Sequence, residues 1–191
     1  MSKLYKYKGT FKTFNGYLLI AGDATKVVLP NIKPLREIYG GKKCDDGILR
    51  STGANVSMLY NCLNHFIFDL AIDKYKTNEK TLIFRNIKNI ANISFLKDKT
   101  KIFIFDRGYP SLEFFYTLLC EGNIKFVFRL PKSMYKKERE AMDTKDGFID
   151  IILSSYSIGS SKASEKIKNE FRKLGKINLR ITTVLLENGE E

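Results

Sequence analysis

The chain has 191 residues, 43% of them apolar and 28% charged, a composition typical of a folded globular protein that excludes wholesale disorder. Lys and Arg number 33 against 21 acidic residues, and the net charge of +12 favours a nucleic-acid partner, although an AT-rich coding sequence would also raise the lysine content. Three widely spaced cysteines and one histidine exclude a disulfide framework and a zinc site, and the lack of a long apolar run leads us to expect an intracellular, cytoplasmic protein.

The first elements lead to an aspartate. Residues 1–16 are basic and aromatic and are predicted to form an N-terminal arm. The apolar run 17–21 stops at Gly22 and Asp23, which predicts a strand buried on both faces with Asp23 at its carboxyl end. Residues 30–53 contain two prolines, a Gly-Gly pair and a charged stretch, so they predict a long loop with at most one helical turn, at 34–39.

The middle of the chain alternates strands and helices. Residues 54–61 and 66–72 are rich in branched and aromatic side chains and predict an antiparallel hairpin. A cap at Thr77 or Asn78 followed by apolar residues at helical spacing predicts a helix over 78–91. The run KIFIF then predicts a strand over 101–105 that ends at Asp106.

A second helix and a last strand complete the predicted domain. Pro110 at the first helical position predicts a helix over 111–122 that closes at Gly122, and residues 124–130 predict another strand. The order strand, hairpin, helix, strand, helix, strand indicates a three-layer α/β domain with a mixed sheet.

The remaining residues differ in character. A basic stretch follows Pro131, and we then expect a strand over 148–153, a Ser-rich loop over 154–164 and a helix over 164–174. An alternating strand over 178–186 meets the hairpin signal Asn188-Gly189, after which only two residues follow. The interrupted hairpin predicts that the chain is the front part of a longer protein.

Asp23 and Asp106 are the candidate site. Ligands of open α/β sheets gather at the carboxyl ends of strands, and an aspartate that loses hydration beside a buried strand needs a compensating partner. Carboxylate oxygens are good ligands for Mg²⁺, and two such ions held close together can catalyse the cleavage of a phosphodiester. Equally, Asp23 is a candidate turn residue, and Asp106 is a candidate to pair with Arg107 or to cap the next helix.

The blocks around these aspartates resemble a known family. FIFDRGYPS at 103–111, IAGDAT at 20–25 and the strand pair between them resemble IS4-family DDE transposases, over about residues 17–133. The resemblance implies a ribonuclease H-like fold that cuts and joins transposon DNA with Mg²⁺ or Mn²⁺ held by Asp, Asp and Glu. Asp23 and Asp106 match the first two of these catalytic metal ligands.

Four further side chains follow from the same blocks. By position we expect them to contact DNA phosphate or a neighbouring carboxylate, since Arg offers a planar donor fork that suits phosphate oxygens. They are Arg107, Tyr109, Arg129 and Lys132. The partner that the resemblance implies is double-stranded DNA at transposon ends, in a bacterial, nucleoid-associated setting.

The family's third carboxylate, in the signature Y-x2-R-x3-E-x6-K, is not found. The nearest string, residues 135–145, places Arg139 one position late and offers Asp143 in place of glutamate, so it predicts a solvated basic helix or loop. Residues 134–191 would then begin a strand-rich insertion. We expect no catalysis by the chain alone, unless a homodimer partner or a complementing chain supplies the missing helix; the alternative is a non-catalytic nucleic-acid-binding or interaction module. A receiver-like doubly wound fold is disfavoured because two hairpin strands precede the first helix.

Overall fold

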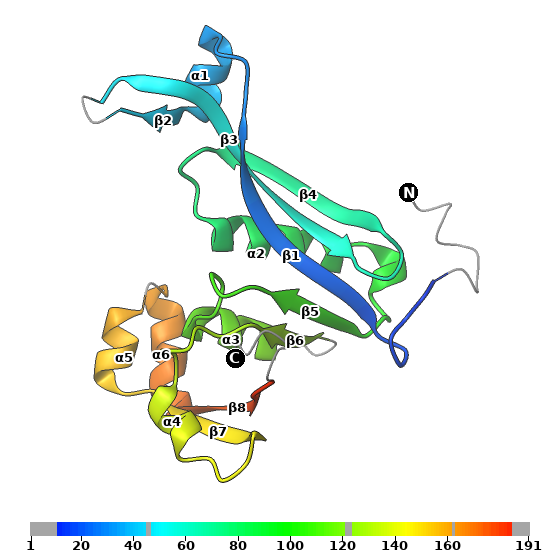
Figure 1. Cartoon of the computed structure of the whole chain (residues 1–191), viewed down its shortest axis with the longest axis vertical. Coiled ribbons are helices and arrows are strands. Elements are labelled where there is room, and N and C mark those ends of the chain that lie inside the picture. Colours follow the sequence, from blue (N-terminus) through cyan, green and yellow to red (C-terminus); the bar gives the residue numbers. More distant parts are fainter. Residues whose placement is uncertain (1–10, 45–46, 121–123, 162, 185–191) are drawn as a thin grey trace. The chain divides into compact units, whose positions relative to one another are not determined.

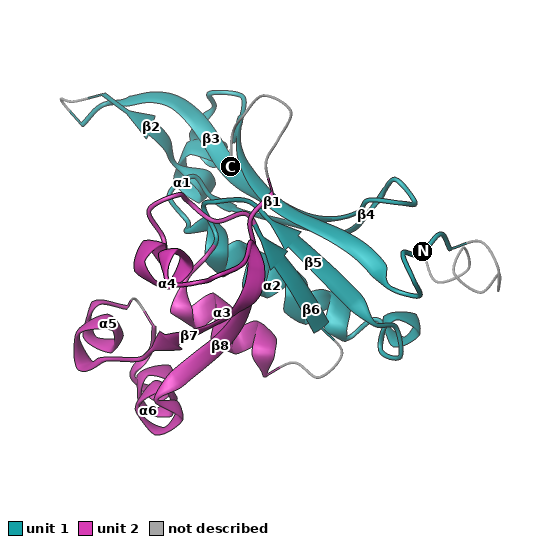
Figure 2. Cartoon of the chain, turned by 60° about the horizontal axis from the view of Figure 1, so that its bottom comes forward, with its two compact units in different colours: residues 1–109, 121–128 teal, residues 110–120, 129–191 magenta. Residues whose placement is uncertain are grey.

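The computed structural model describes residues 11–44, 47–120, 124–161 and 163–184. Its chain divides into two compact units, coloured separately in Figure 2. The first unit contains residues 1–109 and 121–128, and the second contains residues 110–120 and 129–191. None of the helices in the described ranges is long and apolar enough to cross a membrane.

The first unit is built on a mixed sheet. Its strands are β1 (Leu18–Val28), β2 (Gly41–Lys43), β3 (Leu49–Asn61), β4 (Phe66–Lys74), β5 (Lys101–Phe105) and β6 (Ile124–Phe128) (Figure 1). β1 pairs in parallel with β5, and β5 with β6, whereas β3 runs antiparallel to β1 on its other side. β2 and β4 both pair antiparallel with β3. The mixed α/β sheet and the antiparallel hairpin are therefore confirmed, and they are consistent with the ribonuclease H-like fold that the resemblance implies.

Helix α2 (Glu79–Ala91) covers one face of this sheet. It begins as predicted, because the Asn78 side chain accepts a hydrogen bond from the Lys80 amide at 2.9 Å. Two linked hydrogen bonds also join the helix to two strands. Ser57 Oγ donates to Asn86 Oδ1 at 2.5 Å, and Asn86 Nδ2 donates to Asp69 Oδ2 at 2.7 Å. Its apolar stripe is buried, and it comprises Leu82, Ile83, Ile87 and Ile90. A short 3-10 helix, η2 (Ser94–Leu96), leads into β5.

The opposite face of the sheet carries an exposed row of apolar side chains. The row consists of residues that lie opposite one another on five successive strands, and these are Ile67, Tyr60, Ala21, Ile104 and Val127. Beside it lie Leu70 and Ile72 of β4, opposite Met58 and Val56 of β3. The solvent-exposed fractions are 38% for Ile67, 51% for Leu70, 42% for Ile72 and 55% for Val127. We call these nine residues the open face.

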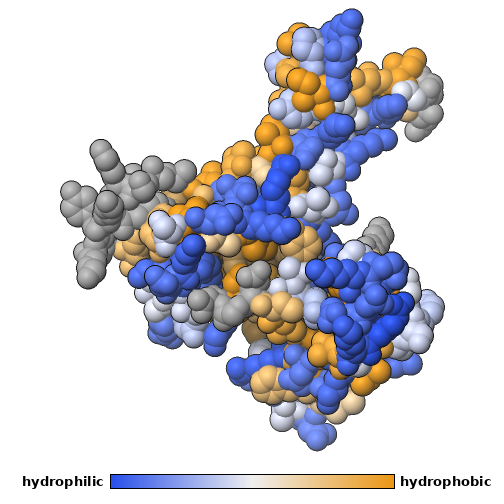
Figure 3. Space-filling model, turned by 180° about the vertical axis from the view of Figure 1, so that it is seen from behind, coloured by the Kyte–Doolittle hydropathy of each residue, from blue (hydrophilic) through white to orange (hydrophobic). Residues whose placement is uncertain are grey.

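Two predictions for the N-terminal half are wrong. β1 continues to Val28 instead of ending at Asp23, because β3 pairs with it as far as Gly53 and Val28. The helical turn predicted at 34–39 is confirmed as α1 (Lys33–Tyr39), but the rest of the predicted loop 30–53 contains β2 and the start of β3. These elements form a hairpin extension whose exposed apolar side chains (orange among blue at the top of Figure 3) include Val28, Ile32, Ile38 and Ile48. The composition of residues 30–53 did not predict this hairpin, because the hairpin forms through backbone pairing with β3.

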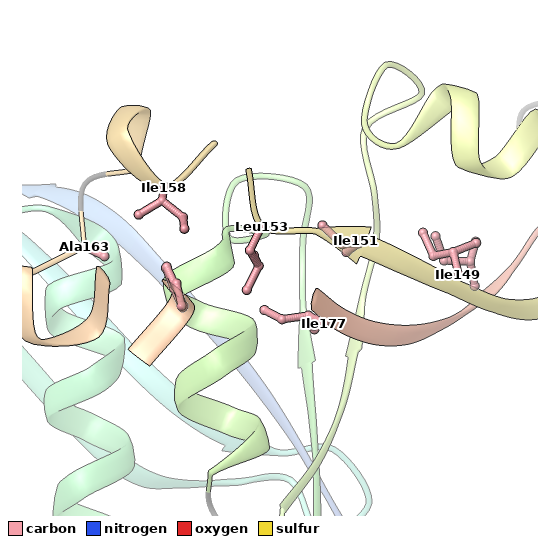
Figure 4. Close-up of a cluster of buried hydrophobic side chains, with 8 residues drawn as sticks. Ile149, Ile151, Leu153, Ile158, Ala163 and Ile177 are labelled. Carbon is pink, nitrogen blue, oxygen red and sulfur yellow. The ribbon is translucent and has the colours of Figure 1, made fainter. Parts of the chain in front are cut away.

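The described part of the second unit contains a two-stranded sheet and four helices. Its elements are α3 (Leu112–Leu119), α4 (Lys136–Glu140), β7 (Asp146–Ile152), α5 (Ser155–Ser160), α6 (Glu165–Leu174) and β8 (Lys176–Thr182). β7 and β8 pair antiparallel, and their inner side chains join α6 in one apolar cluster (Figure 4). The cluster comprises Ile149, Ile151, Leu153, Ile158, Ala163, Phe171, Ile177 and Ile181.

The boundaries of the elements in this unit can be compared with the predicted ones. Ser111 caps α3 by accepting from the Phe114 amide at 3.3 Å, so Pro110 precedes the cap and is not the first helical residue. The Ser-rich loop is in part helix α5, because Ser154 caps it and Ile158 is buried in the core. The predicted helix over 164–174 is confirmed as α6, and the strand predicted over 178–186 is β8, which begins at Lys176. The Asn188-Gly189 turn, Gly122 and residues 1–10 lie outside the described residues.

Candidate functional site

Asp23 and Asp106 come together at the edge where the parallel strands part. The last register pair of β1 and β5 is Gly22 with Phe105; Asp23 is the next residue of β1, and Asp106 directly follows the end of β5. Neighbouring strands lie about 4.8 Å apart, so the two residues start from adjacent backbones. Asp23 also pairs with Met58 of β3, which places it on the same side of the sheet as the open face.

Both carboxylates are exposed to solvent. Burial therefore does not force either of them to take a partner, contrary to the expectation that they lose hydration beside a buried strand. Instead, their position at the open end of the sheet leaves them accessible to an incoming cation. Carboxylate oxygens are ligands that Mg²⁺ and Mn²⁺ accept.

One oxygen of Asp23 receives both of its hydrogen bonds. Oδ1 accepts from the backbone amide of Ala24 at 2.8 Å and from the hydroxyl of Tyr109 at 3.4 Å. Within the described part of the chain, Oδ2 accepts no hydrogen bond. Asp23 is a strand residue, so the alternative that it is a turn residue is wrong.

Asp106 opens a tight turn. Its carbonyl accepts from the Tyr109 amide at 3.1 Å, which folds the chain back directly after β5. Its carboxylate makes no hydrogen bond or ion pair with the described residues, so the alternative of a pair with Arg107 does not hold. The cap of α3 is Ser111, so Asp106 is not that cap either.

The turn brings the side chain of Tyr109 next to Asp23. Tyr109 is only 3% exposed, and its ring lies 5.5 Å from that of Phe105, centroid to centroid. The Phe105 ring in turn lies over Gly22, where a Cβ would stand 2.4 Å from Phe105 Cε1. Sequence reasoning missed this packing, whose only local signal was the glycine before Asp23.

Burial dominates the electrostatics of Tyr109. Desolvation, and after it the negative charges of Asp23 and Glu79, raise the pKa of its phenol above the ordinary value. The hydroxyl therefore keeps its proton across the physiological range. It stands beside Asp23 as a permanent donor.

The other predicted contacts are cationic and exposed. Arg107 lies in the turn after Asp106, whereas Arg129 and Lys132 belong to the second unit. The Lys132 carbonyl accepts from the Arg139 guanidinium. Their contacts with DNA phosphate stay predictions.

The described residues bring no third carboxylate to the two aspartates. Among the residues that the structure describes, no group of three His, Cys, Asp or Glu side chains is arranged to hold a metal ion. The string 135–145 contains the short helix α4, which has no buried residue and whose fourth residue is Arg139. Asp143 is exposed and belongs to the second unit.

Comparison with known proteins bears on this arrangement. A family model described as "Transposase DDE domain" matches residues 15–188, which include both aspartates and both units. The comparison with curated proteins gave no match.

Proposed function

Since the chain belongs to the transposase DDE domain family, we propose that it acts in DNA transposition, with Asp23 and Asp106 as its two catalytic metal ligands. The observation that carries the proposal is the placement of two exposed carboxylates on adjacent parallel strands, immediately after their last register pair. A phosphodiester-cutting site needs carboxylates that are close together and open to solvent. The same geometry would serve IS4-type chemistry, the subfamily whose blocks the sequence resembles.

The residues present fit a hard divalent cation. Asp23 has an oxygen free of hydrogen bonds among the described residues, and the Asp106 carboxylate has two. These would hold Mg²⁺ or Mn²⁺, which in this class of site activates an attacking water or 3′-hydroxyl and stabilises the leaving oxygen. The chain's own contribution is to hold both carboxylates at one edge of a rigid sheet.

We further propose that the site is incomplete without another helix. Three carboxylates are the family's ligand set, and the described residues bring only two together. The open face runs up to Asp23 and exposes apolar side chains that a helical layer would bury. A helix from further sequence, a second copy or a complementing chain would give the three-layer form and bring the third acid, with residues 134–191 as the start of an insertion between the core and that helix.

A non-catalytic interaction module is the second candidate function. The open face favours it, because exposed apolar surface of this kind often marks a binding site for a partner. Mixing the chain with a peptide that carries the Y-x2-R-x3-E-x6-K helix separates the two. Mn²⁺-dependent nicking of duplex DNA in the mixture supports the catalytic candidate, and binding without nicking supports the module.

The metal assignment is tested with two matched variants. Asp106→Asn should weaken Mn²⁺ binding by about 10-fold or more in calorimetric titration, because it removes one of two anionic ligands. It should leave the melting temperature in EDTA unchanged, since the carboxylate has no partner among the described residues. Asp146→Asn, which loses the same charge from β7, should bind Mn²⁺ like the wild type; equal affinities for all three proteins would refute the assignment.

DNA binding is tested by its salt dependence. The net charge of +12 and the exposed Arg107, Arg129 and Lys132 predict binding dominated by phosphate contacts. Affinity for a generic duplex should fall by about 10³-fold or more between 50 and 200 mM salt if six or more phosphates are neutralised, with little sequence preference. An affinity that does not change over this range would contradict the proposal.

A further inference from the structure

Tyr109 is tied to both aspartates by independent contacts. Its backbone amide donates to the Asp106 carbonyl at 3.1 Å, and its hydroxyl donates to Asp23 Oδ1 at 3.4 Å. The side chain thus spans from the turn of one aspartate to the carboxylate of the other. Only the second contact depends on the tyrosine side chain, and a residue that only filled space would not make it.

The position of the ring is fixed by packing. Tyr109 is 3% exposed and lies against Phe105, which itself occupies the space left by the missing Cβ of Gly22. Gly22 directly precedes Asp23, so the contacts form a closed loop from Gly22 through Phe105 and Tyr109 back to Asp23. A hydroxyl held by such a loop has little freedom to follow a carboxylate that rotates away.

The hydrogen bonds are also distributed unevenly on Asp23. Both the Ala24 amide and the Tyr109 hydroxyl donate to Oδ1, and among the described residues none donates to Oδ2. Two donors on one oxygen fix the rotation of the carboxylate. Its other oxygen is left with its lone pairs available.

We infer that Tyr109 is a positioning residue that fixes the Asp23 carboxylate through Oδ1 and reserves Oδ2 for the divalent cation shared with Asp106. The inference rests on the proposed metal site and deepens it. Residues that orient ligands from outside the coordination shell typically change metal affinity by about 10- to 100-fold when removed. Tyr109 therefore acts through Asp23, as distinct from contacting DNA itself.

The test uses the full chain with Tyr109→Phe, which keeps the ring and removes only the hydroxyl. Mn²⁺ affinity by calorimetry should fall by about 10-fold. In metal-free protein labelled with [¹³C]aspartate, the side-chain carboxyl resonance of Asp23, assigned by its loss in Asp23→Asn, should move while that of Asp106 stays. Tyr156→Phe is the matched control, because it removes the hydroxyl of a tyrosine that is 85% exposed on α5 of the second unit; it should change neither reading.

The outcomes separate the inference from the proposed function. If the wild type does not bind Mn²⁺, the metal site itself is refuted. If the wild type binds Mn²⁺ more tightly than Asp106→Asn does, but Tyr109→Phe matches the wild type in affinity and in the Asp23 resonance, the inference is overturned and the metal site stands. A lower melting temperature in EDTA with both readings unchanged would assign Tyr109 a packing role and would equally overturn the inference.

Discussion

The β7–β8 sheet of the second unit and the parallel strand ends of the first unit differ in how their aspartates are paired. In the second unit, the inner face of β7 and β8 is buried, and the outer aspartates Asp146 and Asp150 are paired with Arg180 and Lys176. In the first unit, only one face of the sheet is covered by α2, and neither Asp23 nor Asp106 has a cationic partner among the described residues. Asp73 on β4 of the same unit does pair with Arg85, so the first unit does not leave all of its strand aspartates without a cationic partner. The two strand-end carboxylates that lack one among the described residues are the proposed metal ligands.

The largest effect should come from the closed core of the second unit. Phe171 is fully buried there and packs edge to face on Tyr116 at 5.4 Å. Phe171→Ala should lower the free energy of unfolding by about 3–5 kcal/mol, measured by urea denaturation. Tyr156→Ala removes an aromatic side chain that is 85% exposed and should change it by about 0.5 kcal/mol or less. Similar losses for the two would show that the second unit has no closed core.

The covered face of the first unit should be the next most sensitive. Gly22→Ala places a Cβ 2.4 Å from the Phe105 ring, and such overpacking costs about 1–3 kcal/mol. Gly108→Ala is the matched control, since a Cβ there meets nothing within 4 Å. Thermal unfolding of the two variants checks this. Equal melting temperatures would mean that the Gly22–Phe105 contact imposes no constraint.

The open face should respond weakly to truncation. Leu70 is half exposed and Leu59 is fully buried on the covered side, although both belong to the same antiparallel pair of strands. Leu70→Ala should reduce the free energy of unfolding by about 1 kcal/mol or less, and Leu59→Ala by about 2–5 kcal/mol. If Leu70→Ala costs as much as Leu59→Ala in urea denaturation, the face is already covered in solution.

The smallest effect should come from the paired aspartates, and it should depend on pH. Hydrogen bonds from Arg180 and then from Thr182 lower the pKa of Asp146 from 3.8 to about 2. Because the folded-state pKa is depressed, the stability that this carboxylate contributes is present above pH 3.8 and is lost as pH falls through about 2. At pH 6 the urea concentration at the midpoint of unfolding should be slightly higher for the wild type than for Asp146→Asn. This difference in midpoint should shrink between pH 4 and pH 2. A constant difference would show that the pair does not act through its charge.

The sequence by itself determined the local elements and named the site. The Asn78 cap, the run Lys101–Phe105 and the spacing in 164–174 gave elements that the structure confirms, because caps, apolar runs and helical periodicity act within a few residues. The blocks around Asp23 and Asp106 pointed to the family that the model match shows. The sequence thus suggested Asp23 and Asp106 as ligands without coordinates, and their role stays a prediction.

Tertiary pairing decided the rest. Only the partner strand β3 carries β1 beyond Asp23 and turns part of 30–53 into a hairpin, since ladder hydrogen bonds join residues far apart in sequence. Only the packed turn after Asp106 brings the Tyr109 hydroxyl to Asp23, across 86 positions of the chain. Likewise, only the strand register shows that Asp23 lies on the open face. The side of a sheet that is covered depends on what packs against it, and the sequence pattern of the strand does not specify this.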